Sequence, residues 1–178
     1  LVESEKDTEL VLKVENLSFS YANERKIIEN FNLQLFKGDR IGIKGPIGSG
    51  KSTIVSLLSG LERKHEGKIA FKGQTFDCYE HSFLRKSIVQ VGQKPFLFAA
   101  SLRDNVALDL NLSDEEIWTY LKLACLDSDV KNFPNQIHTQ LGEWGINLSG
   151  GQKQRLTLAR ALARKPELLF LDDCLSAV

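Results

Sequence analysis

One segment constrains the fold of this chain more than any other. Residues 45–52 read GPIGSGKS, which fits the pattern G-x-x-x-x-G-K-[ST] at every required position. Glycines at this spacing let the backbone wrap around an anion with its N–H groups pointing inward. A short apolar run precedes the segment, and a helical pattern follows it, which brings a positive helix end to the same anion. The segment therefore predicts a phosphate-binding loop between a strand and a helix.

The side chains of this loop also have predicted roles. Lys51 can reach the β- and γ-phosphates of a nucleotide and assist catalysis, and the Ser52 hydroxyl can ligate Mg²⁺. An ordinary glycine-rich turn, the alternative, does not need a lysine and a hydroxyl at these two positions. ATP and Mg²⁺ are thus the predicted ligands. The predicted phosphate-binding residues are Gly45, Pro46, Ile47, Gly48, Ser49, Gly50, Lys51, Ser52 and Thr53.

A second feature is an apolar run that ends in two carboxylates. Residues 168–171 read LLFL, and Asp172 and Asp173 follow. A strand of this kind can set one carboxylate beside the phosphate loop, where Asp172 holds Mg²⁺ directly or through water. Asp173 then stands where a general base would meet the attacking water. Two acids at a strand end can also be a solvated edge, a reading that the phosphate loop in the same chain disfavours.

The remaining patterns predict an α/β fold. Alternating apolar residues near the start indicate strands, and a capping box formed by Ser113 and Glu116 opens a helix in a region that we interpret as a helical insertion. A helix is expected from Lys51 to Ser59, and the longest amphipathic helix runs over residues 149–164. The expected strands are residues 10–21, 27–36, 40–44, 67–71, 87–91 and 168–171.

Composition narrows the function. The 178 residues carry 23 basic and 23 acidic side chains, a neutral balance that disfavours a nucleic-acid partner. No apolar run approaches the roughly 18 residues that a membrane-spanning helix needs. The chain has three cysteines without a metal-ligand spacing, and we expect all three to be reduced packing residues. They are Cys78, Cys125 and Cys174.

A third motif, LSGGQ, stands between the other two and opens the long helix. Its residues are Leu148, Ser149, Gly150, Gly151 and Gln152. With the three motifs in this order, the chain from Leu10 to Val178 resembles the nucleotide-binding domains of ABC proteins. Ser149 is also a good helix cap, so a purely structural role for the motif is the alternative.

The resemblance implies a P-loop NTPase core with a mixed, mainly parallel sheet, an antiparallel β part at the N-terminus and a helical insertion. It implies that residues 10–92 and 151–178 form the core, with about 93–150 as a helical subdomain that includes the start of the signature. Residues 1–9 are acidic and polar and predict a linker. The family continues beyond the position of Val178, so we expect the C-terminal part of the domain to be missing.

The resemblance implies further site residues. Tyr21 corresponds to the aromatic residue that stacks on adenine, although an edge-strand tyrosine is the plainer reading. Gln93 corresponds to the glutamine that contacts Mg²⁺ and the lytic water, with a surface glutamine as the alternative. The implied metal ligands are Ser52, Gln93 and Asp172, and the implied catalytic residues are Lys51, Gln93 and Asp173. Residues 141–145 resemble an exporter segment that puts Glu143 in a coupling position.

The resemblance also implies a function and partners. Two such domains pair head to tail, with ATP between the phosphate loop of one and the signature of the other. The partners are a second, identical or different ABC domain and a transmembrane domain. The chain would then be the ATPase of an exporter on the cytoplasmic side of a membrane. A soluble ABC ATPase is an alternative.

One position departs from the family pattern. Active members usually carry glutamate after the Mg²⁺-binding aspartate, where this chain has Asp173. The shorter side chain withdraws the carboxylate by about 1.5 Å, and a displacement of that order can cost about a hundredfold in rate. We therefore also expect that this site could be a degenerate or regulatory ATP site with little hydrolysis of its own.

Overall fold

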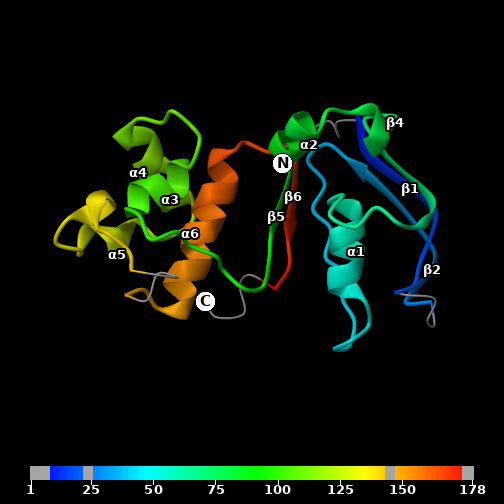
Figure 1. Cartoon of the computed structure of the whole chain (residues 1–178), viewed down its shortest axis with the longest axis horizontal. Coiled ribbons are helices and arrows are strands. Elements are labelled where there is room, and N and C mark those ends of the chain that lie inside the picture. Colours follow the sequence, from blue (N-terminus) through cyan, green and yellow to red (C-terminus); the bar gives the residue numbers. More distant parts are fainter. Residues whose placement is uncertain (1–8, 22–25, 143–146, 174–178) are drawn as a thin grey trace, which may run out of the picture. The chain divides into compact units, whose positions relative to one another are not determined.

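The computed structural model describes residues 9–21, 26–142 and 147–173 of the chain. Two compact units make it up, Leu1–Leu84 and Arg85–Val178. Figure 1 shows the elements of both. Apart from Glu9, the expected linker lies outside the described residues, and so do Glu143 and Cys174.

The first unit contains an antiparallel sheet. Its strands lie in the order β2-β1-β3-β4, and every neighbouring pair is antiparallel. The long central strand β1 buries Leu12, Val14 and Leu17 on the side of the core, as its alternating pattern predicts. This confirms the antiparallel part at the N-terminus. The strands are β1 Leu10–Phe19, β2 Ile28–Phe36, β3 Glu66–Phe71 and β4 Gln74–Thr75.

Helix α1 (Lys51–Leu58) follows the phosphate loop directly, as predicted. It buries Val55, Leu57 and Leu58, and Gly60 after it has a φ of 75°, a left-handed conformation that suits a helix stop. A short 3₁₀ turn, η1 (Phe76–Cys78), and helix α2 (His81–Ser87) come later in the sequence.

One predicted strand is not formed. Residues 40–44 are irregular, and Ile41 and Ile43 are 52% and 38% exposed. A strand requires a neighbouring strand to accept its backbone hydrogen bonds, and neither sheet of the described residues includes this segment. The alternating apolar pattern was therefore an insufficient signal there.

The second unit combines a parallel strand pair with helices. β5 (Ile88–Val91) pairs in parallel with β6 (Leu168–Leu171). The unbroken apolar run of residues 168–171 predicts a buried parallel strand, and the parallel pairing is confirmed. The predicted burial is wrong, because β6 is only half-buried and Leu171 is 44% exposed. The helices are α3 Leu102–Ala107, α4 Asp114–Leu123, α5 Asp127–Lys131 and α6 Gly150–Ala163, with the 3₁₀ turn η2 Gln136–His138.

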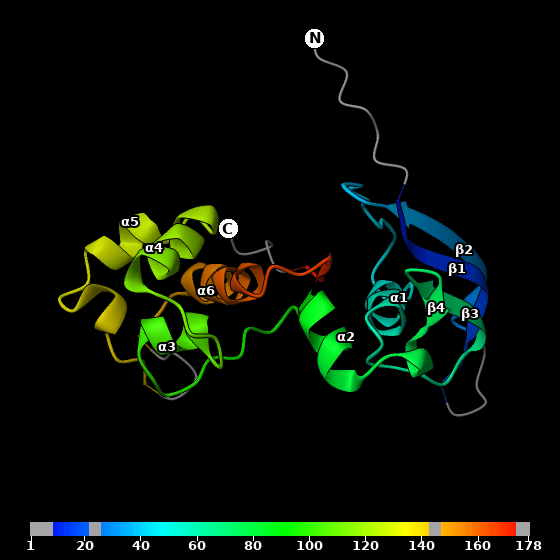
Figure 2. The ribbon, with the colours of Figure 1, turned by 90° about the horizontal axis from the view of Figure 1, so that it is seen from above.

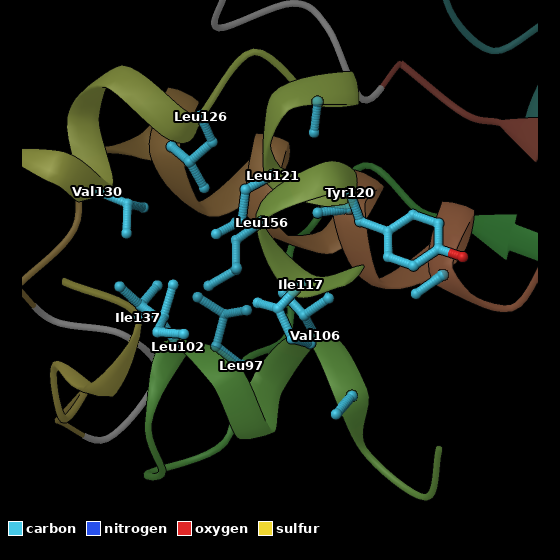
Figure 3. Close-up of a cluster of buried hydrophobic side chains, with 14 of the residues drawn as sticks. Leu97, Leu102, Val106, Ile117, Tyr120, Leu121, Leu126, Val130, Ile137 and Leu156 are labelled. Atoms are coloured by element: carbon cyan, nitrogen blue, oxygen red, sulfur yellow. The ribbon is translucent and has the colours of Figure 1, made fainter. Parts of the chain in front are cut away.

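Helix α6 is the centre of this helical region, and α3 and α4 pack against it (Figure 2). Leu156 of α6 is fully buried among apolar side chains from α3, α4 and α5. Figure 3 shows this cluster, whose labelled members are Leu97, Leu102, Val106, Ile117, Tyr120, Leu121, Leu126, Val130, Ile137 and Leu156. Truncating a leucine in such a core typically costs about 2–5 kcal/mol, so this cluster holds the helices together.

Local signals in this unit were reliable. Ser113 and Glu116 form the predicted capping box at the start of α4, which buries Ile117, Tyr120 and Leu121. Cys78 and Cys125 are free thiols, but both are exposed, so the prediction that they are packing residues is wrong. Cys78 is the last residue of η1, and Cys125 follows the C-cap residue of α4. Taken together, the two sheets and the helices confirm the predicted mixed α/β class.

Candidate functional site

The phosphate loop depends on glycine at two positions. Gly48 and Gly50 have φ values of 80° and 87°, which side chains rarely adopt. Gly50 is also the N-cap of α1, and a Cβ there would lie 2.7 Å from Cγ2 of Ile27. Any other residue at position 50 would therefore need both a strained left-handed backbone and a shift of the Ile27 side chain.

Lys51 holds the loop from within. Its Nζ donates to the carbonyl oxygens of Gly45 at 2.9 Å and Pro46 at 2.8 Å. The backbone N–H of Ser49 donates to the same Pro46 carbonyl at 3.2 Å and closes a turn, whose tip residue Ile47 is fully exposed. The amine of Lys51 thus lies over the loop at the N-terminal end of α1, where a phosphate would be bound.

Tyr21 lies beside the end of the same loop. Its hydroxyl is 3.3 Å from Oγ1 of Thr53, and its ring contacts the edge of Phe19 with centroids 4.7 Å apart. Tyr21 is 48% exposed, so the ring keeps accessible surface. Such a ring is available for stacking on a flat apolar ligand next to the phosphate loop.

In the second unit, the parallel strands bring three of the predicted residues to one edge. Gln93 follows β5, and Asp172 and Asp173 follow β6. The Asp172 N–H donates to the Val91 carbonyl at 2.9 Å, and Nε2 of Gln93 donates to Oδ2 of Asp173 at 3.2 Å. Asp173 has a φ of 48°, in the left-handed region that aspartate tolerates better than most residues. The carboxyl edge of parallel strands is where α/β proteins bind ligands.

The predicted metal ligands belong to different units. Ser52 lies in the first unit, and Gln93 and Asp172 lie in the second. Their joint binding of one ion stays a prediction, as does the division of catalysis between Lys51, Gln93 and Asp173.

The signature segment forms the first turn of α6. Oγ of Ser149 accepts from the Gln152 N–H at 3.2 Å, and Oε1 of Gln152 accepts from the Ser149 N–H at 2.9 Å. Leu148 is buried in the helical core. A Cβ added at Gly150 would meet no atom within 4 Å, so this chain's own packing leaves room there for a side chain. The capping alternative is therefore real, but capping does not explain a glycine at position 150.

Two residues that sequence reasoning missed connect α6 to the segment after Gln93. Arg160 donates to the carbonyl oxygens of Phe96 and Asn105, at 2.7 Å each, and to Oδ1 of Asn105 at 2.7 Å. Asn105 is fully buried. Its Oδ1 also accepts from the Phe98 N–H, and its Nδ2 donates to the Phe98 carbonyl. No local pattern could have revealed this network, because 55 residues separate Arg160 from Asn105.

Burial has a consequence for Arg160. Loss of hydration, and to a smaller degree the charge of Arg164, lowers the pKa of its guanidinium to about 10. Arg160 also lines a hollow of about 290 Å³ beside the segment after Gln93. The other residues of this hollow include Lys94, Pro95, Phe96, Thr157 and Arg164. Both a cation and apolar surface are therefore open to a ligand or a partner there.

The sequence comparison decides the family. The family model described as ABC transporter matches residues 28–176. The chain belongs to the ABC transporter family. It is 37% identical over 170 residues to antigen peptide transporter 2 of Rattus norvegicus, which covers 94% of this chain and 24% of that protein. It is 39% identical over 163 residues to the multidrug resistance-like ATP-binding protein MdlB of Buchnera aphidicola, covering 91% of this chain and 28% of that protein.

Solved structures agree. A structure of a bacterial Atm1-family ABC exporter with ATP bound matches with a TM-score of 0.88 and 32% identity, over 95% of this chain and 30% of that one. This ABC domain therefore spans between 24% and 30% of the length of these relatives. Among its described residues, no helix combines the length and the hydropathy that crossing a bilayer requires. The family and these relatives identify the chain as an ATP-binding domain of an ABC transporter.

Proposed function

We propose that this domain binds and hydrolyses ATP and thereby drives export of a substrate across a membrane. The observation that carries the proposal is the phosphate loop, in which Gly50 has a left-handed backbone with Ile27 close by and Lys51 lies over the carbonyls of Gly45 and Pro46 at the start of α1. A glycine-rich loop at a helix N-terminus, with a lysine amine over it, suits the phosphates of a nucleotide. We infer export rather than import because the similar proteins include an ABC exporter and a multidrug resistance-like protein.

The residues of this chain also fit Mg²⁺. Ser52 follows Lys51 on α1, Asp172 comes directly after β6, and Gln93 lies two residues after β5, so each supplies an oxygen, from a hydroxyl, a carboxylate and an amide. Oxygen ligands of these kinds are those that Mg²⁺ prefers. When bound, Mg²⁺ neutralises charge on the phosphate oxygens. In this proposal Lys51 binds the terminal phosphates, Tyr21 stacks on the base, and Gln93 orients the attacking water.

The proposal includes two partners. A second ABC domain, identical or different, completes each nucleotide site with its own signature, because the first turn of α6 carries free space at Gly150 that a phosphate could approach. The other partner is a transmembrane domain, to which the pairing of the two ABC domains is coupled. The ABC domain lies on the cytoplasmic side of the membrane. Exporter-type relatives support both assignments.

The test is ATP hydrolysis by the full-length protein in a lipid bilayer, with Mg²⁺ and with excess chelator. The proposal predicts turnover that needs Mg²⁺ and that stops when Ser149 at the start of the signature is replaced by arginine, a bulky cation. Hydrolysis that continues unchanged in the Ser149→Arg protein would exclude the sharing of a site between two domains.

A second candidate, a slow or regulatory ATP site, is favoured by Asp173. This carboxylate is one methylene shorter than the glutamate of active relatives, and Gln93 donates to it at 3.2 Å. The candidate predicts that Asp173→Glu raises single-turnover hydrolysis about tenfold or more, since an atom misplaced by about 1 Å can cost a hundredfold. If Asp173→Glu leaves the single-turnover rate unchanged, the degenerate-site reading is wrong.

A further inference from the structure

The glutamine of the signature is held at both ends of its amide by its own chain. Oε1 of Gln152 accepts from the Ser149 N–H at 2.9 Å, which forms half of the capping box. Nε2 of Gln152 donates to Oδ1 of Asp129 at 2.9 Å. Asp129 therefore fixes which way the Gln152 amide faces, and so which atom is presented to the cap.

Arg155 closes the arrangement one turn further along α6. Its Nη2 lies 3.4 Å from Oδ2 of Asp129, and its Nη1 donates to the Cys125 carbonyl at 3.2 Å. The side chains of Asp129 and Arg155 are 32% and 25% exposed. Partial removal from water strengthens such charged hydrogen bonds relative to exposed pairs. The two oxygens of Asp129 are thus used for two different residues of α6.

Asp129 itself is attached to a rigid part of the molecule. Its helix, α5, is anchored by Val130, which is fully buried, and by Leu126 just before the helix, which is 1% exposed. Both belong to the cluster drawn in Figure 3. The carboxylate is therefore presented by the helical core and does not depend on a mobile loop.

We propose that Asp129 is a positioning residue for nucleotide binding by the signature. It orients Gln152, Gln152 completes the cap of Ser149, and the first turn of α6 then directs its backbone N–H groups at the phosphates of a nucleotide held by the partner domain. The inference rests on the proposed function, because it needs a nucleotide that two domains share. It goes further in assigning that role to a residue outside all three motifs.

The experiment measures ATP hydrolysis by the full-length protein in a lipid bilayer as a function of ATP concentration. Asp129→Ala removes the acceptor for Gln152, and we expect the KM for ATP to rise about fivefold, with kcat changed less than about twofold. Asp129→Asn retains an acceptor oxygen but not the charge, and it should restore KM to within about twofold of the unmodified protein. The matched control is Asp127→Ala on the same helix, which loses the pair with Lys131 and backbone hydrogen bonds at the start of α5 but leaves Asp129 in place, and it should leave KM unchanged.

A double-mutant cycle separates positioning from general stabilisation. If Asp129 acts through Gln152, then Asp129→Ala adds less than about a twofold increase in KM when Gln152 is already leucine. Gln152→Leu alone should reproduce the KM increase of Asp129→Ala, which also provides the test if the Asp129→Ala protein does not fold.

The outcomes are distinct. An unchanged KM in both Asp129→Ala and Gln152→Leu, or additive effects in the cycle, would overturn the positioning role while leaving the proposed function intact. The same holds if Asp129→Asn is as impaired as Asp129→Ala, since the hydrogen bond to Gln152 would then not be the cause. Absence of ATP hydrolysis in the unmodified protein would instead overturn the proposed function, and the inference with it.

Discussion

The phosphate loop leads into the N-terminus of α1, and the signature forms the N-terminus of α6, but different interactions fix the two backbones. In the loop, glycines with left-handed backbones set the path, and Lys51 bonds to carbonyl groups of the loop itself. In the turn, side chains do this work, since Ser149 and Gln152 cap each other and Asp129 holds Gln152 from a neighbouring helix. One site is defined by its backbone and the other by packing.

If each site binds a phosphate, as proposed, this difference sets what each site depends on. A loop shaped by its own glycines can be read from sequence and needs little from the rest of the fold. A helix start shaped by tertiary contacts depends on the core beneath it, here the cluster around Leu156. We therefore expect replacement of Lys51 to change nucleotide chemistry with little change in stability, and replacement of Arg160 in the buried network behind α6 to lower stability first.

The largest effect should come from Lys51→Met. The substitution removes the charge that meets the terminal phosphates, and loss of one such group typically costs a hundredfold or more in rate. We expect ATP turnover of the full-length protein to fall at least about a hundredfold. Amide hydrogen exchange in α1 should stay within about threefold of the unmodified protein. Weakened protection throughout α1 would show that Lys51 is structural and would break the comparison.

Arg160→Met tests the opposite case. It leaves the Asn105 and Phe96 carbonyls without their buried donor, which we expect to cost about 2 kcal/mol of local stability. Amides of α3 and α6 should then exchange about thirtyfold faster. Arg164→Met, one turn later and paired with the exposed Asp109, is the control and should change exchange little. Equal effects of both substitutions on amide exchange would mean that the buried network does not stabilise α3 and α6 more than the exposed pair does.

Two glycines of the loop separate backbone strain from steric contact. Both Gly48→Ala and Gly50→Ala force a left-handed φ on alanine, which costs about 1–2 kcal/mol. Only the second also places a Cβ 2.7 Å from Ile27. In equilibrium titrations, we expect ATP affinity to fall about tenfold for Gly48→Ala and further for Gly50→Ala. A weaker effect at position 50 than at position 48 would contradict the described loop path.

The smallest effect on this chain is expected for Gly150→Ala. A Cβ meets nothing within 4 Å, and alanine favours helix over glycine by up to about 1 kcal/mol. Hydrogen exchange of α6 should therefore be unchanged or slower. Any loss of ATP turnover in this variant then arises where α6 meets a second molecule. Faster exchange would show that glycine serves the fold of the chain itself.

Sequence was sufficient wherever the cause was local. The phosphate loop, the capping boxes of Ser113 and Ser149 and the apolar face of α4 all follow from residues within a few positions of each other. Periodicity also predicted strands near the start of the chain and before Asp172, whereas the antiparallel pairing of the N-terminal part was implied by the family resemblance. These features need no knowledge of the rest of the molecule.

Sequence was insufficient where a distant partner decides. Residues 40–44 have the pattern of a strand but no neighbouring strand among the described residues to pair with. Asp129 and Asn105 stand in no motif, and their partners Gln152 and Arg160 are 23 and 55 residues away. The exposure of Cys125 depends on where α4 ends relative to the core. Each of these is a property of packing, which a single sequence does not display.

The most direct test of the account is a calorimetric titration of the full-length protein with ATP, with and without Mg²⁺, and with adenosine as the comparison. A triphosphate bound through the phosphate loop and Mg²⁺ predicts that ATP affinity falls at least about tenfold when Mg²⁺ is removed, and that adenosine binds far more weakly than ATP. Equal affinities for ATP and adenosine, unaffected by Mg²⁺, would contradict it.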